Sequence, residues 1–122
     1  MTTAARMIAF AGALLCLSAV ILGALGSHLV DMKGMQGIWK TASNMHLFNA
    51  AGLMGVAALL SNFGSGVLKW GAWTIITGTL IFSGSIYLHV ITGMMITNMA
   101  PVGGMLMMTG WGLVALAFLR KP

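Results

Sequence analysis

Four long apolar segments, separated by short polar breaks, constrain the fold of this chain more than any other feature. They lie at about residues 6–26, 43–61, 68–92 and 101–119, and each is close to the roughly 20 residues that a helix needs to cross a bilayer. Charged residues make up only 6% of the 122 residues, whereas about a quarter is usual for a water-soluble domain. The sequence therefore predicts an all-α integral membrane protein, a four-helix bundle that forms a single transmembrane domain over residues 1–122.

The first apolar segment has two interpretations. The sequence Ala24-Leu25-Gly26, before Ser27, resembles the small-residue cleavage site of a secretory signal peptide. The apolar run from Met7 to Leu25 is, however, longer than the roughly 7–15 residues of a signal-peptide core. We therefore expect this segment to be retained as the first transmembrane helix.

The basic residues are scattered at the edges of the apolar segments, where they flank membrane spans. Nucleic-acid-binding proteins instead cluster Lys and Arg on one face, so the net charge of +5 does not indicate a nucleic-acid partner. With four spans, one side of the membrane carries Arg6, Lys69, Arg120 and Lys121, and the other carries Lys33 and Lys40. The positive-inside rule then predicts a protein of the bacterial cytoplasmic (inner) membrane with both termini in the cytoplasm.

The long interruption at residues 23–49 is the segment from which we expect any chemistry to start. If the part from Gly26 to Lys40 is helical, one stripe of it carries His28, Met32, Met35 and Trp39. Such a segment is predicted to lie along the membrane surface between the first two helices, with Trp39 at the headgroup level. We expect a polar mouth on this side of the bundle, with candidate residues His28, Asp31, Trp39, His46, Asn49 and Tyr87.

His46 and Asn49 are three residues apart, so they share one helix face. Polar side chains within a membrane usually face the bundle interior or a water-filled cavity. One interpretation is a small polar pocket or proton-accessible site that also includes His28. The favoured interpretation is that the imidazole and the amide bond a neighbouring helix and fix the bundle.

Enzymatic activity is not expected. General acid–base catalysis needs positioned titratable groups, usually in pairs, and Asp31 is the only carboxylate side chain. Ser27, His28 and Asp31 contain the residue types of a nucleophilic site, but closeness in the sequence does not create the required geometry.

A metal or haem site is the sharper alternative, because the chain has three histidines and twelve methionines, and imidazole and thioether groups suit copper or haem iron. Methionine is also a flexible apolar filler, and no strong ligand spacing occurs. No cofactor is therefore predicted, and the weak metal-ligand candidates are His28, His46, Met32 and Met35.

Several short motifs resemble the YgdD-like family, also called domain of unknown function 423, which includes the eukaryotic transmembrane protein 256. The motifs are Gly23-Ala24-Leu25-Gly26-Ser27-His28, Trp39-Lys40-Thr41-Ala42, Phe82-Ser83-Gly84-Ser85-Ile86-Tyr87, Pro101-Val102-Gly103-Gly104 and Gly110-Trp111. The resemblance covers nearly the whole chain in matching order, and it implies a small multi-pass membrane protein of unestablished biochemical role. The chain departs from the family at Asn49, where a histidine is usual, and also at Met45, Ala100 and His89.

The physical interpretation of these motifs is close helix packing. The residues expected to serve it are Gly23, Gly26, Gly84, Ser85, Pro101, Gly103, Gly104, Gly110 and Trp111. The leading hypothesis is a non-enzymatic protein that acts by helix association, with itself or as an accessory subunit of a larger membrane complex. The alternatives are a pore or carrier for a small solute or proton, and a metal- or haem-binding protein.

Overall fold

The protein consists of four long α-helices. The computed structural model describes residues 1–28, 34–94 and 99–119, and these form α1 (Thr3–His28), α2 (Gln36–Phe63), α3 (Gly66–Thr92) and α4 (Met99–Ala117). All four helices are long and apolar enough to cross a membrane, and the described ranges contain no strand. The all-α, four-helix membrane prediction is confirmed.

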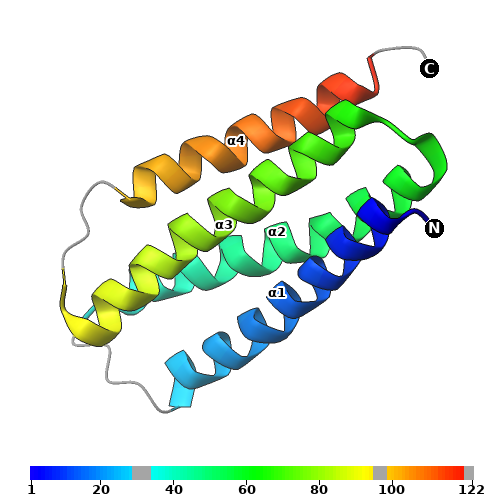
Figure 1. Cartoon of the computed structure of the whole chain (residues 1–122). Coiled ribbons are helices and arrows are strands. Elements are labelled where there is room, and N and C mark those ends of the chain that lie inside the picture. Colours follow the sequence, from blue (N-terminus) through cyan, green and yellow to red (C-terminus); the bar gives the residue numbers. More distant parts are fainter. Residues whose placement is uncertain (29–33, 95–98, 120–122) are drawn as a thin grey trace.

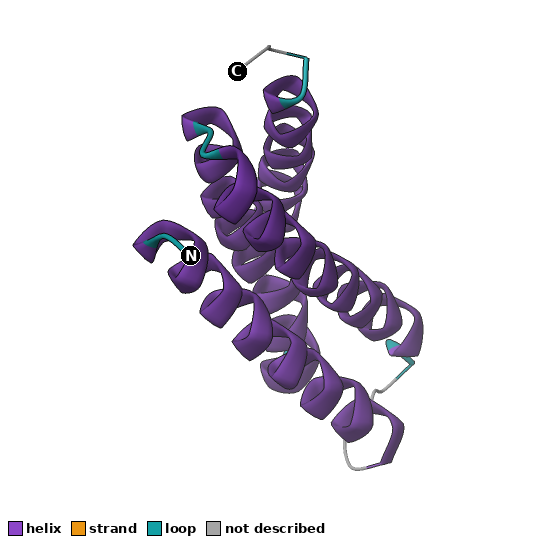
Figure 2. Ribbon diagram, turned by 90° about the vertical axis from the view of Figure 1, so that its right-hand side faces the viewer, coloured by secondary structure: helices purple, strands orange, loops and turns teal. Residues whose placement is uncertain are grey.

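Consecutive helices run in opposite directions (Figure 1), and each packs against the next one along the chain. α1 and α3 touch only lightly, and α4 lies on the far side of α3 from α1. Figure 2 shows the start of α1 and the end of α4 at the same end of the bundle. The turn between α2 and α3 also lies at this end, which we call the terminal end.

Each of the two helix ends at that turn has its own cap. Gly64 ends α2 with φ of 51°, a left-handed conformation that glycine adopts without a Cβ penalty, and its N–H donates to the Leu60 carbonyl. Ser65 then begins α3, since its Oγ accepts the N–H of Leu68 at 3.2 Å. The two caps satisfy backbone groups that the helix ends leave without partners.

Buried residues repeat at alternating spacings of three and four along the helices, which is the pattern of left-handed coiled-coil packing. In α2 this stripe comprises Trp39, Ala42, His46, Asn49, Leu53, Val56 and Leu60. In α1 it comprises Ala5, Ile8, Gly12, Leu15 and Ala19. The polar residues His46 and Asn49 therefore occupy core positions of an otherwise apolar seam.

The α3–α4 contact depends on two layers of facing glycines. Gly71 faces Gly110, and Gly78 faces Gly103, at the same seven-residue spacing in both helices. A Cβ built on either member of the first pair would lie 3.0 Å from its partner's carbonyl oxygen, and for the second pair this distance is 2.8 Å. Because real Cβ atoms do not approach backbone so closely, only glycine permits this helix separation.

Two apolar clusters fill the bundle. The main cluster occupies the terminal end and includes Ile8, Leu53, Leu68 and Ile75. The smaller cluster, at the opposite end, consists of Trp39, Ala42, Tyr87 and Val90. Most of the hydrogen-bonded polar core lies between them.

Where the structure describes it, the predicted surface segment at residues 26–40 belongs mostly to the ends of two long helices. Gly26 belongs to the last turn of α1, and Trp39 and Lys40 belong to the first turns of α2, while residues 29–33 lie outside the described ranges. Trp39 is only 4% exposed, so its ring faces the interior of the bundle and does not lie on its surface. The physical reason is that its ring packs on Tyr87 and its N–H finds a carbonyl inside the bundle.

We expect Gly103→Ala to destabilise the bundle by about 1–3 kcal/mol, because the new methyl would lie 2.7 Å from the Phe82 Cα. The matched control is Gly55→Ala on the exposed side of α2, where nothing lies within 4 Å of an added Cβ. Because alanine is a better helix former than glycine, the control is expected to leave the free energy of unfolding unchanged or to raise it by up to about 1 kcal/mol. Equilibrium unfolding in mixed micelles measures both, and equal stability of the two variants would contradict the glycine layers.

Candidate functional site

Trp39 joins the start of α2 to the end of α1. Its indole Nε1 donates to the main-chain carbonyl of Leu22 at 3.1 Å. Gly26, one turn further along α1, leaves room for the ring, since a Cβ there would lie 2.6 Å from Trp39 Cδ1. The indole N–H therefore has the partner that a buried tryptophan requires.

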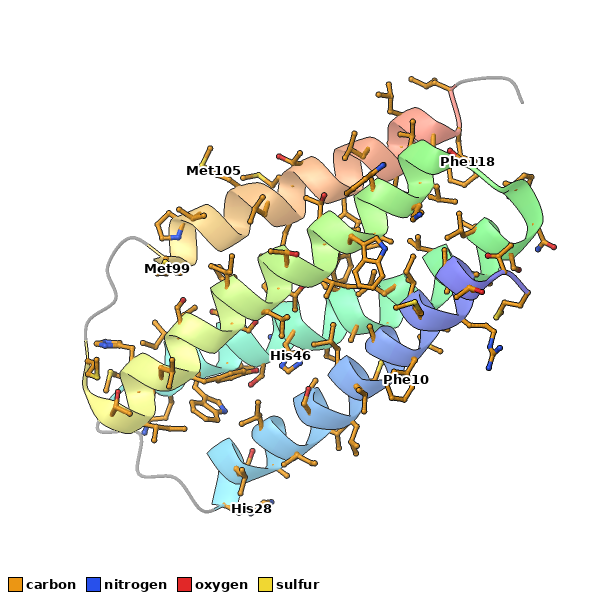
Figure 3. The ribbon with its side chains drawn as sticks, viewed as in Figure 1. Phe10, His28, His46, Met99, Met105 and Phe118 are labelled. Atoms are coloured by element: carbon orange, nitrogen blue, oxygen red, sulfur yellow. The ribbon has the colours of Figure 1, made fainter. Side chains whose placement is uncertain are left out.

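His46 links three helices from the centre of the bundle (Figure 3), and it is only 5% exposed. Its Nε2 lies 3.0 Å from Ser18 Oγ on α1, and its Nδ1 lies 3.0 Å from the Tyr87 hydroxyl on α3. Ser18 uses its own hydrogen to donate to the Leu15 carbonyl at 3.0 Å. We therefore assign the proton to Nε2, which donates to Ser18, while Nδ1 accepts from Tyr87.

Tyr87 continues this chain toward the opening of the bundle. Its hydroxyl lies 3.5 Å from Ser43 Oγ on α2. Its ring packs against Trp39, with ring centroids 4.8 Å apart. We call the four residues Ser18, His46, Tyr87 and Ser43 the His46 network.

Asn49 faces α4, one helical turn from His46. It is 2% exposed, its Nδ2 donates to Met107 Sδ at 2.8 Å, and its Oδ1 accepts from Trp111 Nε1 at 2.7 Å. Gly52 makes room for this indole, because a Cβ there would lie 2.6 Å from Trp111 Cη2. Asn49 thus ties α2 to α4 and satisfies a buried indole, which is a structural role.

Two hollows adjoin the His46 network. An open groove of ≈ 370 Å³ lies between the end of α1 and the start of α2, and its wall includes Lys40, Ser43 and Asn44. A mostly apolar, half-open cavity of ≈ 240 Å³ lies between α1 and α3, and His46 and Tyr87 form part of its wall. Polar groups therefore connect the groove to the cavity through Ser43 and Tyr87. Toward the terminal end, the main apolar cluster closes this polar path.

The predicted polar mouth is only partly assembled. Trp39, His46 and Tyr87 come together, whereas His28 is exposed at the last residue of α1 and lies away from His46 (Figure 3). Met35 is the half-buried residue that precedes α2. Asp31 and Met32 lie outside the described residues.

The predicted packing residues also divide. Gly26, Gly103 and Gly110 meet a neighbouring helix closely, and the Trp111 indole is bonded to α2. Gly23 and Gly84 have nothing within 4 Å of an added Cβ, and Gly84 lies on the cavity wall. Their predicted close approach is therefore wrong. The remaining predicted residues contribute less to packing. Ser85 donates to the Phe82 carbonyl of its own helix at 2.9 Å, and Pro101 is exposed in the first turn of α4. A Cβ added to Gly104 would lie 3.9 Å from Phe82 Cδ1, an ordinary contact distance.

Sequence reasoning missed several members of these contacts. Ser18 is the residue of α1 that bonds His46. A hydroxyl within a long apolar segment could have indicated such a contact from the sequence. Gly71 and Gly78 repeat at seven residues, as Gly103 and Gly110 do, and this matched spacing could have revealed the α3–α4 contact.

The described residues do not form a recognisable metal site around His28 or His46. Across residues 1–28, 34–94 and 99–119, no three side chains of His, Cys, Asp or Glu come within metal-binding reach of one another. Both ring nitrogens of His46 already have hydrogen-bond partners. The expectation that no cofactor binds stays a prediction.

Comparison with known proteins shows where such chains occur. Residues 22–104 match the family model described as protein of unknown function, DUF423. A UPF0382 membrane protein of Staphylococcus epidermidis is 33% identical over 113 residues, which cover 89% of this chain and 92% of that protein. YwdK, a UPF0382 membrane protein of Bacillus subtilis, is 32% identical over 115 residues, which cover 89% of this chain and 93% of that protein. The UPF0382 inner membrane protein YgdD of Escherichia coli is 28% identical over 105 residues, which cover 83% of this chain and 80% of that protein. No solved structure matches significantly.

We expect Tyr87→Phe to destabilise the bundle by about 0.5–2 kcal/mol, because His46 Nδ1 loses its hydrogen-bond donor inside an apolar interior. The matched control is Ser85→Ala in the same helix, since Ser85 bonds only to its own turn. Unfolding in mixed micelles gives the free-energy difference. If Tyr87→Phe costs no more than Ser85→Ala, the His46 network does not hold α2 to α3.

Proposed function

The chain belongs to the DUF423 family of membrane proteins, as its motifs predict, and we propose that it acts by helix association, as a homo-oligomer or as an accessory subunit of a larger membrane complex. The proposal includes no catalytic step. Its main support is the exposed face of α4.

The exposed face of α4 is rich in methionine and small residues. Met105 and Met108 are 64% and 69% exposed, and Gly112 and Ala115 follow on the same stripe at spacings of four and three. Figure 3 shows Met105 pointing away from the rest of the bundle. We call Met105, Met108, Gly112 and Ala115 the outer face of α4.

This outer face has the features of a protein-binding surface within a membrane. Small residues let a second helix approach closely, and flexible methionine side chains adapt to an irregular partner. The exposed side of α1 is different, because it presents bulky side chains at Phe10, Leu17 and Val20, which suit lipid tails. Association through α4 therefore has more support than association through α1.

The predicted orientation is part of this proposal. Arg6 and Lys69 both lie at the terminal end, since α1 and α3 begin there. The sequence adds Arg120 and Lys121 after the described part of α4. The positive-inside rule supports a cytoplasmic terminal end.

Cysteine crosslinking tests the association. In a Cys16→Ala background, we expect Met108→Cys to give disulfide-linked dimers in native membranes if the chain is a homo-oligomer. Leu17→Cys is the matched control, because it is also exposed and lies near the middle of its helix. A photoreactive residue at position 108 is expected to capture a different subunit if the chain is accessory. A monomer that crosslinks at neither site would contradict the proposal.

A carrier of protons or of a small polar solute is a second candidate, supported by the His46 network. Histidine, tyrosine and serine side chains can exchange hydrogen bonds with protons or polar molecules, and here they connect the groove between α1 and α2 to the half-open cavity between α1 and α3. Because apolar side chains close the terminal end of this path, transport would need a second conformation of the bundle. A fixed pore through one protomer is disfavoured.

Flux into liposomes tests this candidate. We expect His46→Leu to abolish proton or solute flux, because leucine keeps the volume of the side chain and removes both ring nitrogens. His28→Leu is the matched control, since His28 is exposed outside the network, and it is expected to retain flux. Flux that survives His46→Leu unchanged would remove the network from any transport mechanism.

A further inference from the structure

We propose that the groove between α1 and α3 at the terminal end binds one acyl chain of an anionic phospholipid, whose phosphate lies at Arg6. This groove has a volume of ≈ 630 Å³ and is separate from the hollows beside the His46 network. Thr3 and Arg6 form its polar end. The proposal does not rest on the association proposed above.

The walls of the groove are apolar and open to the membrane. On α1 they are formed by Met7, Phe10 and Leu14, all about half exposed or more, with Ala11 between them. Trp73 of α3 forms the facing wall. The groove exists because α1 and α3 touch only lightly along this seam. Two hydrocarbon walls that face the bilayer suit a lipid tail better than a polar molecule.

The length of the groove fits one leaflet. From Thr3 to Leu14 the helix rises about 16 Å, at roughly 1.5 Å per residue. Half of the roughly 30 Å hydrocarbon core of a bilayer is about the same length. With the phosphate at Arg6, the part of the groove left for the acyl chain runs from Arg6 to Leu14, a rise of about 12 Å. An acyl chain in it would extend most of the way to the middle of the membrane while its headgroup stays at the surface.

The charge at the end of the groove selects the headgroup. The sequence has a single carboxylate side chain, that of Asp31, and none of the residues that line the groove is acidic. Lys69 lies one helical turn before Trp73, on the same face of α3 and at the same end of the bundle. A guanidinium group binds phosphate through two parallel hydrogen bonds, and basic sites between cytoplasmic helix ends favour anionic lipids.

Native mass spectrometry of the full-length protein tests this site. The protein is exchanged into detergent with equal amounts of phosphatidylglycerol and phosphatidylethanolamine. We expect one phosphatidylglycerol molecule to remain bound preferentially. Arg6→Gln is expected to lower this preference about fivefold, the factor that one basic residue supplies near an anionic surface. The matched control is Lys40→Gln, an exposed lysine at the other end of the bundle, and it is expected to leave the preference unchanged.

A second variant tests the apolar part of the groove. Ala11→Phe places a ring between the walls, so we expect it to lower total lipid retention while Arg6 stays intact. Circular dichroism checks that both variants keep wild-type helicity, and Ala11→Leu replaces Ala11→Phe if the larger ring unfolds the protein. Equal retention of the two lipids, or unchanged retention in Arg6→Gln or in the folded groove variant, would overturn the proposal and leave only a nonspecific lipid shell.

Discussion

The structure depends on the inability of lipid to form hydrogen bonds, which obliges each polar group within the spans to find a partner in the protein. Within the described ranges, no buried side-chain nitrogen or oxygen lacks a hydrogen bond. Isolated hydroxyls such as that of Thr79 donate to their own helix, but the imidazole of His46 and the amide of Asn49 reach neighbouring helices. The indole of Trp39, which donates to α1, and the hydroxyl of Ser83, which donates to the Ala42 carbonyl of α2 at 2.9 Å, do the same. These interhelical bonds help to fix which helix faces meet.

The distance between neighbouring helices determines which helix pairs pack closely and which leave a groove or cavity between them. The facing glycines of α3 and α4 bring two backbones together, so this pair has little freedom to rearrange. The α1–α3 seam has no such pairs, and Gly84 on its α3 side leaves open space instead of a close contact. Glycine therefore permits close packing of α3 against α4 but leaves space between α1 and α3, depending on which face of the helix it occupies.

The sequence was sufficient for the four spans, because apolar length alone identifies a membrane helix. It was misleading at Trp39, since polar neighbours such as Lys40 suggested a surface segment, whereas a heptad position directs the indole inward. Asn49 was expected to bond a neighbouring helix, but nothing in the sequence showed that its partners lie 58 and 62 residues away, at Met107 and Trp111. Such partners follow from the order in which helices pack, which hydropathy does not encode.

The α1–α3 seam is where any movement of this bundle has the lowest cost. Both the cavity beside His46 and the groove beside Arg6 lie along it, and few contacts cross it. One polar connection does cross it, from Ser18 through His46 to Tyr87. Displacement of α1 would break the Ser18 contact and widen the half-open cavity, while the glycine-packed α3–α4 pair stays in place. A lipid tail between the two helices would oppose the reverse movement, so occupancy of the groove and exposure of His46 are expected to be coupled.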